Sequence, residues 1–495
     1  MKKILIIGGG ISGLTAGIFA QKSGFESIIY EKHNILGGEC TGWDRGEYHI
    51  DGCIHWLTGT KEGHELNKIW KQVGALGNVN IYKPDKFITV EHEGRQISIH
   101  RDLNKLKEDF LEISPEDSEE IENLIENIKN FEKVQMPYDK PLDMMSTIEI
   151  IKFGMPMRKL RKILKVMSDM SVEEFCSRFK SPFIKKALIS VIPSNYNAAS
   201  LMFALATFTG DNGDFPAGGS KAMVERMVEK YLGLGGKIKT NTEIEEILID
   251  EGNAYGVKKK SGSEEYGNYI IPACDTFVTL NNLLKGKYVD KKFTDRYSDS
   301  VRYPLPSCVY LSFAVDADMT DYPEKFVFDS APYHCGDKVY HEVSLNHYCY
   351  EDFAPKGKSI AISAIMTDKN DYLFWNDLKK QNPSKYKEEK LGLANKIITC
   401  IEQRFPELTG KIEILDVATP VTYERYCGAY QGAWMSFVPT PKSEQMIHDG
   451  KIKGIKSLYM TGQWLMPPGG LPVALITGKW VIQRICEKEK VHFVK

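Results

Sequence analysis

The stretch Ile4-Leu5-Ile6-Ile7-Gly8-Gly9-Gly10-Ile11-Ser12-Gly13 decides the fold of this chain. Its four leading apolar residues form an unbroken run, which is typical of a parallel strand covered on both faces. Gly8 allows a tight turn, Gly10 lets the backbone approach a pyrophosphate, and Gly13 lets the next helix pack close to the strand. We therefore expect a strand, a turn and a helix that ends near Ser23, with the helix N-terminus directed at phosphate groups.

A second strand and an acidic residue complete this fingerprint. Residues 27–30 are typical of a strand, and it ends at Glu31, roughly 20 residues past the glycines, where a carboxylate binds ribose hydroxyls. One glycine fingerprint alone is a weak signal, but here the strand, turn, helix, strand and acid occur in order. The alternative is a glycine-rich turn followed by a solvated glutamate.

The N-terminus also has features of a secretory signal, since Lys2 and Lys3 precede an apolar stretch. Three glycines interrupt that stretch, and the strand–helix–strand unit continues without a break to Glu31. We therefore expect a mature N-terminus and an intracellular, cytoplasmic protein.

The composition excludes several classes of function. The 495 residues are enough for two or three domains. With 64 basic and 66 acidic residues the net charge is −2, which does not favour nucleic-acid binding. The ten cysteines are scattered without a C-x-x-C pair, so we expect reduced thiols. No histidine pair has metal-ligand spacing on a helix, and we expect no metal site.

Three further segments carry a resemblance to a known group. Gly37-Gly38 is followed by residues 48–57, YHIDGCIHWL; residues 214–220 read DFPAGGS; and residues 458–472 read LYMTGQWLMPPGGLP. Together with the fingerprint, these segments resemble the phytoene desaturases, carotenoid isomerases and retinol saturases, which are amine-oxidase-like FAD enzymes. The chain has Glu39 where that group usually carries Arg or Lys.

The resemblance implies an α/β fold in which a Rossmann-type FAD-binding domain, assembled from separated segments, carries an inserted α+β substrate domain. We expect the FAD-binding domain to comprise residues 1–80, 214–300 and 416–495. The substrate or lid domain is then expected at residues 81–213 and 301–415.

The resemblance also implies which residues bind FAD. The strand residue Ile244 is expected to offer its backbone to the adenine, and the loop before the last helix is expected to face the isoalloxazine. The expected cofactor-binding residues are Gly8, Gly10, Ile11, Ser12, Gly13, Glu31, Lys32, Gly37, Gly38, Glu39, Ile244, Gly462, Gln463, Gly469, Gly470, Leu471 and Pro472.

His55 and Trp56 are the candidate catalytic residues, because the resemblance puts their stretch beside the flavin ring. The alternative is that His55 is a core histidine whose hydrogen bonds are all made within the protein. The sequence contains no G-x-S-x-G nucleophile turn, so the difficult chemical step is best assigned to the flavin.

We expect an oxidoreductase, or a flavin-dependent isomerase, that acts on carbon–carbon bonds of a lipophilic unsaturated substrate held in a narrow apolar channel. A flavin amine oxidase is the first alternative. A flavin-free binding protein of the same architecture, as in the GDP-dissociation inhibitors, is the second.

The segment from Lys152 to Lys165 interleaves basic residues with large apolar ones, as interfacial helices do. We expect a peripheral contact with the inner face of a membrane. A lid helix with a solvated basic face is the alternative.

Overall fold

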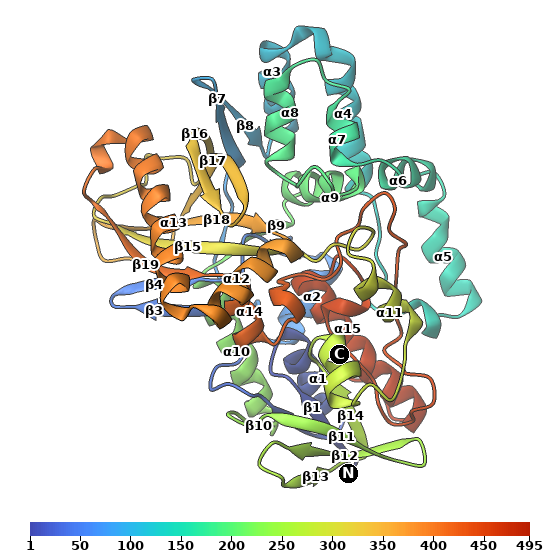
Figure 1. Cartoon of the computed structure of the whole chain (residues 1–495). Helices are drawn as coiled ribbons and strands as arrows, with labels where there is room; N and C mark the ends of the chain where they lie inside the picture. The colour runs from blue at the N-terminus through green and yellow to red at the C-terminus, as the bar shows by residue number, and fades with distance from the viewer.

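A computed structural model describes residues 1–495. Its dinucleotide-binding part is built on a four-stranded parallel sheet in the order β10-β2-β1-β14. These strands are β1 (Lys3–Ile7), β2 (Glu26–Tyr30), β10 (Lys237–Lys239) and β14 (Tyr269–Pro272). They lie near both chain ends in the lower half of Figure 1.

The parallel sheet is covered on both faces, which explains the unbroken apolar run of β1. Ile4 and Ile6 pack among helices α1 (Ile11–Lys22), α10 (Gly219–Gly233) and α15 (Gly470–Glu489). Leu5 and Ile7 point the other way, toward the antiparallel sheet of β11 (Ile244–Asp250), β12 (Asn253–Lys259) and β13 (Glu264–Tyr266). The strand, helix and strand expected over residues 4–30 are confirmed.

A second, seven-stranded sheet has the order β19-β15-β18-β17-β16-β7-β8. Its strands are β7 (Lys86–His92), β8 (Arg95–His100), β15 (Ser307–Val315), β16 (Lys325–Cys335), β17 (Lys338–His347), β18 (Ser359–Thr367) and β19 (Ile412–Ala418). Neighbouring strands are antiparallel except β16 and β7, which run parallel. Helices α12 (Lys369–Gln381), α13 (Pro383–Arg404) and α14 (Pro420–Cys427) lie beside this sheet (Figure 1).

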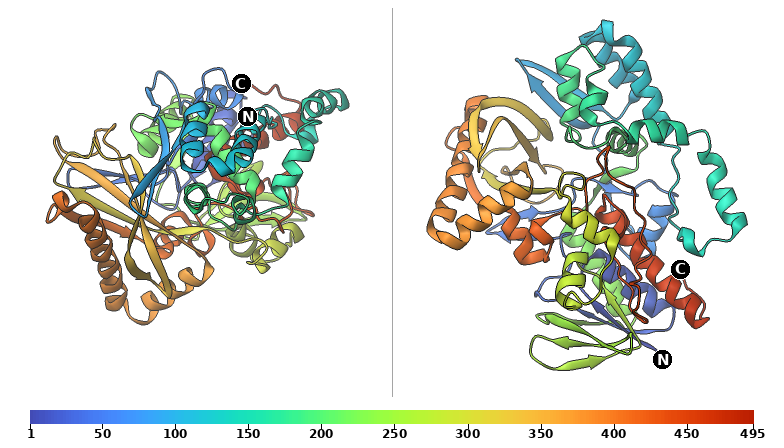
Figure 2. Two further views of the ribbon diagram at one scale, coloured as in Figure 1. Left: turned by 90° about the horizontal axis from the view of Figure 1, so that it is seen from above. Right: turned by 45° about the vertical axis from the view of Figure 1, so that its right-hand side comes forward.

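A helical group follows β8 and forms the top of Figure 1. It comprises α3 (Leu103–Ile113), α4 (Ser118–Phe131), α6 (Arg161–Ser168), α7 (Val172–Cys176), α8 (Pro182–Ile189) and α9 (Ala198–Thr209), which share one apolar core. Helix α5 (Thr147–Met157) differs, because none of its residues is buried. It stands out from the body in all three views (Figures 1 and 2).

Short elements join the two large sheets. They are the hairpin of β3 (Gly42–Arg45) and β4 (Tyr48–Asp51), the three-stranded sheet of β5 (Leu57–Thr58), β9 (Gly213–Pro216) and β6 (Ile81–Tyr82), and helices α2 (Glu65–Gln72) and α11 (Lys291–Ser298). No helix of the chain is both long enough and apolar enough to span a bilayer.

Three local features depart from regular helices and strands. Pro115 opens a single 3-10 turn, and α4 begins three residues later, because the Asp117 carboxylate accepts the Ser114 hydroxyl at 2.7 Å instead of leaving that hydroxyl free to cap. Pro156 lies within the last turn of α5, and a separate helix begins at Arg161. Residues 458–461 follow β14 with only one isolated bridge, between Leu458 and Ile270, and do not form a full strand.

Candidate active site

The glycine turn has the geometry that the sequence requires. Gly8 has a φ of +109°, and a Cβ at Gly13 would lie 2.1 Å from the Gly8 carbonyl oxygen. The helix can approach the strand only because Gly13 has no side chain. Gly10 is different, since its nearest neighbour would be 3.6 Å away, an ordinary contact. Space beside Gly10 therefore remains for a ligand to approach the backbone.

Glu31 is buried at the end of β2 and reaches back to this turn. Its two oxygens accept hydrogen bonds from the backbone N–H groups of Gly9 (2.8 Å) and His33 (3.0 Å). The Glu31 carbonyl accepts from Thr242 N–H at 2.8 Å, which brings the start of β11, at Ile244, next to the acid. The start of β11, which belongs to the separate antiparallel sheet, therefore lies beside the carboxyl end of β2.

The second glycine pair lies directly against the first turn. Gly37 N–H donates to the Gly9 carbonyl at 2.9 Å, and Gly38 approaches Gly10 closely. Lys32, by contrast, directs its ammonium to the Arg425 carbonyl at 3.4 Å.

Glu39 is half-buried and stands where the resembling group usually carries a basic residue. Its carboxyl accepts a hydrogen bond from the Gln463 side chain at 3.2 Å. Burial raises the pKa of Glu39 well above its usual range, and the nearby Asp275 carboxyl adds to the shift. Burial likewise raises the pKa of Asp275 to about 6. Burial therefore favours the neutral form of the Glu39 carboxyl, which weakens its repulsion of an anionic diphosphate.

The last loop returns the chain to the glycine turn. Gly462 has a φ of +129°, and a Cβ there would face the Ser12 hydroxyl at 3.6 Å. The Gln463 side-chain oxygen accepts from Gly470 N–H at 2.9 Å. Gly469 precedes α15, and Leu471 and Pro472 lie in its first turn, so the positive end of this helix borders the same region.

These residues fit FAD. The first N–H groups of α1 have no side-chain cap and are available to a diphosphate. Three buried polar atoms on the segments around Gln463 lack any protein partner: Trp434 Nε1, Ser436 Oγ and Thr461 Oγ1. The Gln463 amide donates to the Trp434 carbonyl at 3.3 Å, and Ser436 N–H donates to the Pro468 carbonyl at 3.0 Å, so all three atoms border this loop.

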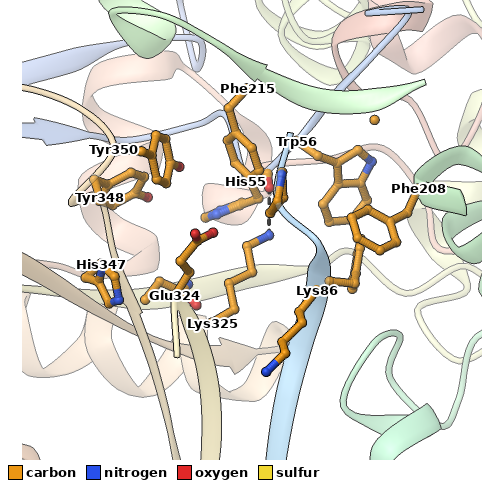
Figure 3. A pocket seen from close by; sticks show the side chains of 14 residues that line it. His55, Trp56, Lys86, Phe208, Phe215, Glu324, Lys325, His347, Tyr348 and Tyr350 are labelled. Atoms are coloured by element: carbon orange, nitrogen blue, oxygen red, sulfur yellow. Dashed lines mark hydrogen bonds between the residues drawn. The ribbon is translucent and has the colours of Figure 1, made fainter. Parts of the chain in front are cut away.

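A cavity lies next to the predicted catalytic pair. His55 and Trp56 both line it, together with side chains from β7, β16 and the segment after β17 (Figure 3). The His55 ring also packs edge-on against Trp434, with 6.0 Å between ring centroids, which connects the cavity to the cofactor cleft. The free volume is about 20 Å³, enough for about one water molecule. The structure thus has a small, partly open cavity here, which is narrower than the channel we expected.

His55 is a neutral histidine in this setting. Burial lowers its pKa to about 4, and the neighbouring Lys325 ammonium contributes. The Lys325 Nζ donates to the His55 carbonyl at 2.7 Å, so the two residues are directly joined (Figure 3).

Sequence reasoning missed most of the cavity. Lys325 opens β16 and Glu324 directly precedes it, Lys86 opens β7, and Tyr350 follows β17. A single lysine at the start of a strand gives no signal in the sequence, because only the folded chain brings it to the His55 loop, through the pairing of β16 with β7 and the packing of Phe87 on Trp56.

A parallel sheet with this glycine turn, a buried acid at the second strand and a distant loop that closes the cleft defines a dinucleotide-binding flavoprotein. Residues 6–73 match the family described as NAD(P)-binding Rossmann-like domain. The fold resembles that of wild-type putrescine oxidase bound to putrescine, with a TM-score of 0.60, 11% identity, and coverage of 98% of this chain and 99% of that one.

Relatives of similar length define the class more closely. The chain is 23% identical to the chloroplastic prolycopene isomerase of Arabidopsis thaliana, over 97% of this chain and 82% of that protein. It is 22% identical to the all-trans-retinol 13,14-reductase of Homo sapiens, over 97% and 85% of the two chains. The resemblance found in the sequence is confirmed. The protein is an FAD-dependent oxidoreductase that resembles the carotenoid desaturases and isomerases.

Proposed function

We propose that this protein oxidises, reduces or isomerises carbon–carbon double bonds of an apolar, unsaturated substrate, and that the small cavity beside His55 and Trp56 widens to admit one end of it. The relatives support this proposal, since the prolycopene and retinol in their names are both polyenes. Flavin N5 supplies hydride acceptance or donation when FAD is bound.

One observation favours this proposal over an amine oxidase. Aromatic cages are suited to ammonium ions, and the cage in this cavity already surrounds an ammonium of the chain itself, that of Lys325. Two like charges 4 Å apart repel by roughly 4 kcal/mol in a partly shielded site. The only carboxylate among the cavity residues, Glu324, already accepts the Tyr82 hydroxyl. A substrate ammonium would therefore meet a cation without a free anion.

The candidate catalytic residues have physical roles that follow from their surroundings. His55 is uncharged at neutral pH, so its ring can hydrogen-bond to a substrate without placing a second cation in the cavity. Trp56 packs on Phe87 with 5.2 Å between ring centroids and offers an apolar wall. These two residues would orient an apolar chain and exclude water.

The test is product analysis by chromatography after anaerobic incubation of the FAD-loaded protein. Carotenoids, retinoids and unsaturated lipids are compared with primary amines and amino acids, each with oxidised and with reduced flavin. We expect altered double bonds in at least one polyene and no amine conversion. Amine conversion without any lipid product would reverse the assignment.

We propose further that α5 and α6 contact an anionic membrane surface. Ile148 is 66% exposed and Met155 is 69% exposed, which is unusual for large apolar side chains. The exposed basic residues of the same segment are Lys152, Arg158, Lys159, Arg161, Lys162 and Lys165. Apolar side chains beside lysines and arginines suit the boundary between acyl chains and anionic headgroups, from which a lipophilic substrate could be extracted.

Liposome flotation tests this contact. The wild type is expected to float with anionic vesicles more than with neutral ones, and the double variant Ile148→Glu, Met155→Glu is expected to lose that difference. Leu391→Glu is the matched control, since Leu391 is 51% exposed on α13. Equal flotation with both vesicle types would remove the proposal.

The division into domains belongs to the same proposal. We assign residues 1–80, 214–300 and 416–495 to the FAD-binding domain, and residues 81–213 and 301–415 to the substrate domain. A cytoplasmic protein docked at the inner membrane face would combine these assignments with the exposed α5.

A further inference from the structure

Lys325 is a cation without a counter-ion. Its Nζ lies 5.4 Å from the ring centroid of Trp56 and 5.2 Å from those of Phe87 and Phe215. The only hydrogen bond of this ammonium is the one to the His55 carbonyl, at 2.7 Å. The carboxylate next to it in sequence, Glu324, forms no ion pair with it and is bound by the Tyr82 hydroxyl instead.

This arrangement leaves hydrogen-bonding capacity unused. A lysine ammonium has three donors, and one of them is accounted for. Burial of a charge is costly unless a partner compensates it, and here burial lowers the pKa of Lys325 to about 8. The group still carries its charge at neutral pH, with its remaining donors among aromatic rings that line the cavity (Figure 3).

We propose that the cavity selects unsaturated substrates that carry a carboxylate or carbonyl oxygen, and that Lys325 Nζ donates a hydrogen bond to that oxygen. This inference rests on the proposed function and narrows its substrate class. The rings of Trp56, Phe87 and Phe215 would hold the apolar part of such a molecule, while the oxygen completes the shell of the ammonium. An otherwise identical hydrocarbon leaves the half-buried cation unpaired and is rejected for that reason.

Lys86 is a second lysine of this cavity with which Lys325 can be compared. It lines the same cavity, but it is exposed, so water already solvates its charge. A substrate oxygen gains little from a solvated surface cation and more from a half-buried cation among aromatic rings. The selectivity is therefore assigned to Lys325 and not to the mere presence of positive charge.

The probe for the experiment is cis-parinaric acid, a conjugated tetraenoic acid whose fluorescence rises in apolar surroundings. Its methyl ester retains the carbonyl without the charge, and the corresponding alcohol lacks both. In the FAD-loaded wild type we expect the acid, the ester or both to bind roughly ten- to hundredfold more tightly than the alcohol. Tighter binding of the acid than of the ester identifies the carboxylate as the recognised group. Tighter binding of the ester identifies the carbonyl.

The variants decide whether Lys325 is responsible. Lys325→Met is expected to lower the preference over the alcohol to near unity while the alcohol itself still binds, and Lys86→Met is expected to retain the preference. Equal affinities of the wild type for all three probes, or a preference that Lys325→Met retains, would overturn the inference. Neither result would contradict the proposed binding of an apolar substrate. If none of the three probes binds the wild type, the proposed function fails with it.

Discussion

The cofactor cleft and the cavity beside His55 are neighbours, but they are built in opposite ways. The cleft presents mostly backbone: a turn of glycines, the uncapped N–H groups of α1 and the loop before α15. The cavity presents side chains, contributed by the His55 loop, β7, β9, β16 and the segment after β17.

This difference separates what is common to the class from what is particular to this chain. Backbone can approach a diphosphate only where Cβ atoms are absent, so the cleft restricts its own sequence. The cavity imposes no such rule, and one lysine within an aromatic cage is enough to change which ligands it accepts. The following predictions probe the two regions in turn.

The largest effect is expected for Gly13→Ala in the cleft. The added Cβ would lie 2.1 Å from a backbone oxygen of Gly8, so either α1 or β1 must move. We expect a loss of about 3 kcal/mol or more in the free energy of unfolding, measured by denaturant titration of the apoprotein. A variant as stable as the wild type would show that the close helix–strand contact is not required.

Gly10→Ala is the matched substitution and should separate binding from folding. Its Cβ would meet nothing closer than 3.6 Å, and the backbone φ of −74° suits alanine. We expect stability within about 1 kcal/mol of the wild type, together with loss of FAD, because the methyl group lies where the pyrophosphate approaches. Full flavin absorbance in the purified variant would contradict the assignment of this turn.

Glu31→Ala should weaken FAD retention without unfolding the protein. The variant loses an acceptor for ribose hydroxyls and also frees the N–H groups of Gly9 and His33, which Glu31 now binds. A roughly ten- to hundredfold weaker FAD affinity is expected by equilibrium dialysis. Wild-type occupancy in this variant would rule out the ribose assignment.

In the cavity, a smaller effect should appear with pH. The Lys325 ammonium loses its proton as the pH rises through about 8, so the preference for parinaric acid over the alcohol should decline above that pH. Because the ordinary lysine value is 10.5, the unfolded chain holds more protons between about 8 and 10.5, and this lysine makes unfolding less favourable as the pH rises in that window.

The other titratable groups that face the cavity are Glu324, Lys86, His55, His347, Tyr348 and Tyr350. Burial lowers the pKa of both histidines and raises the pKa of both tyrosines, away from this window. Lys325→Met should therefore remove the pH dependence of the preference. An unchanged profile in that variant would assign the titration to another group.

The sequence predicted the cleft because its constraints are local. Gly8, Gly13 and Glu31 lie within one strand–turn–helix–strand unit, and each meets a need that few other residues can meet. Ile244 and the loop at Gly462 came only from the resemblance, since nothing in their own composition marks a cofactor contact.

The cavity could not be predicted in the same way. Lys325 and His55 are far apart in the sequence and meet only in the folded chain, where β16 pairs with β7 and Phe87 of β7 packs on Trp56. The small size of the cavity depends on the packing of rings such as Trp56 on Phe87, which periodicity does not reveal. The raised pKa of Glu39 likewise depends on burial. The sequence shows only that an acid stands where the resembling group carries a basic residue.

One measurement tests the central claim, that an FAD cleft adjoins a cavity for unsaturated, oxygen-bearing chains. The flavin absorbance of the purified protein is recorded anaerobically while cis-parinaric acid is titrated in, and again with a long-chain primary amine. The account predicts a saturable change in the flavin spectrum with the acid, one that Lys325→Met weakens, and no change with the amine. A flavin spectrum that responds to the amine and not to the acid would contradict the account.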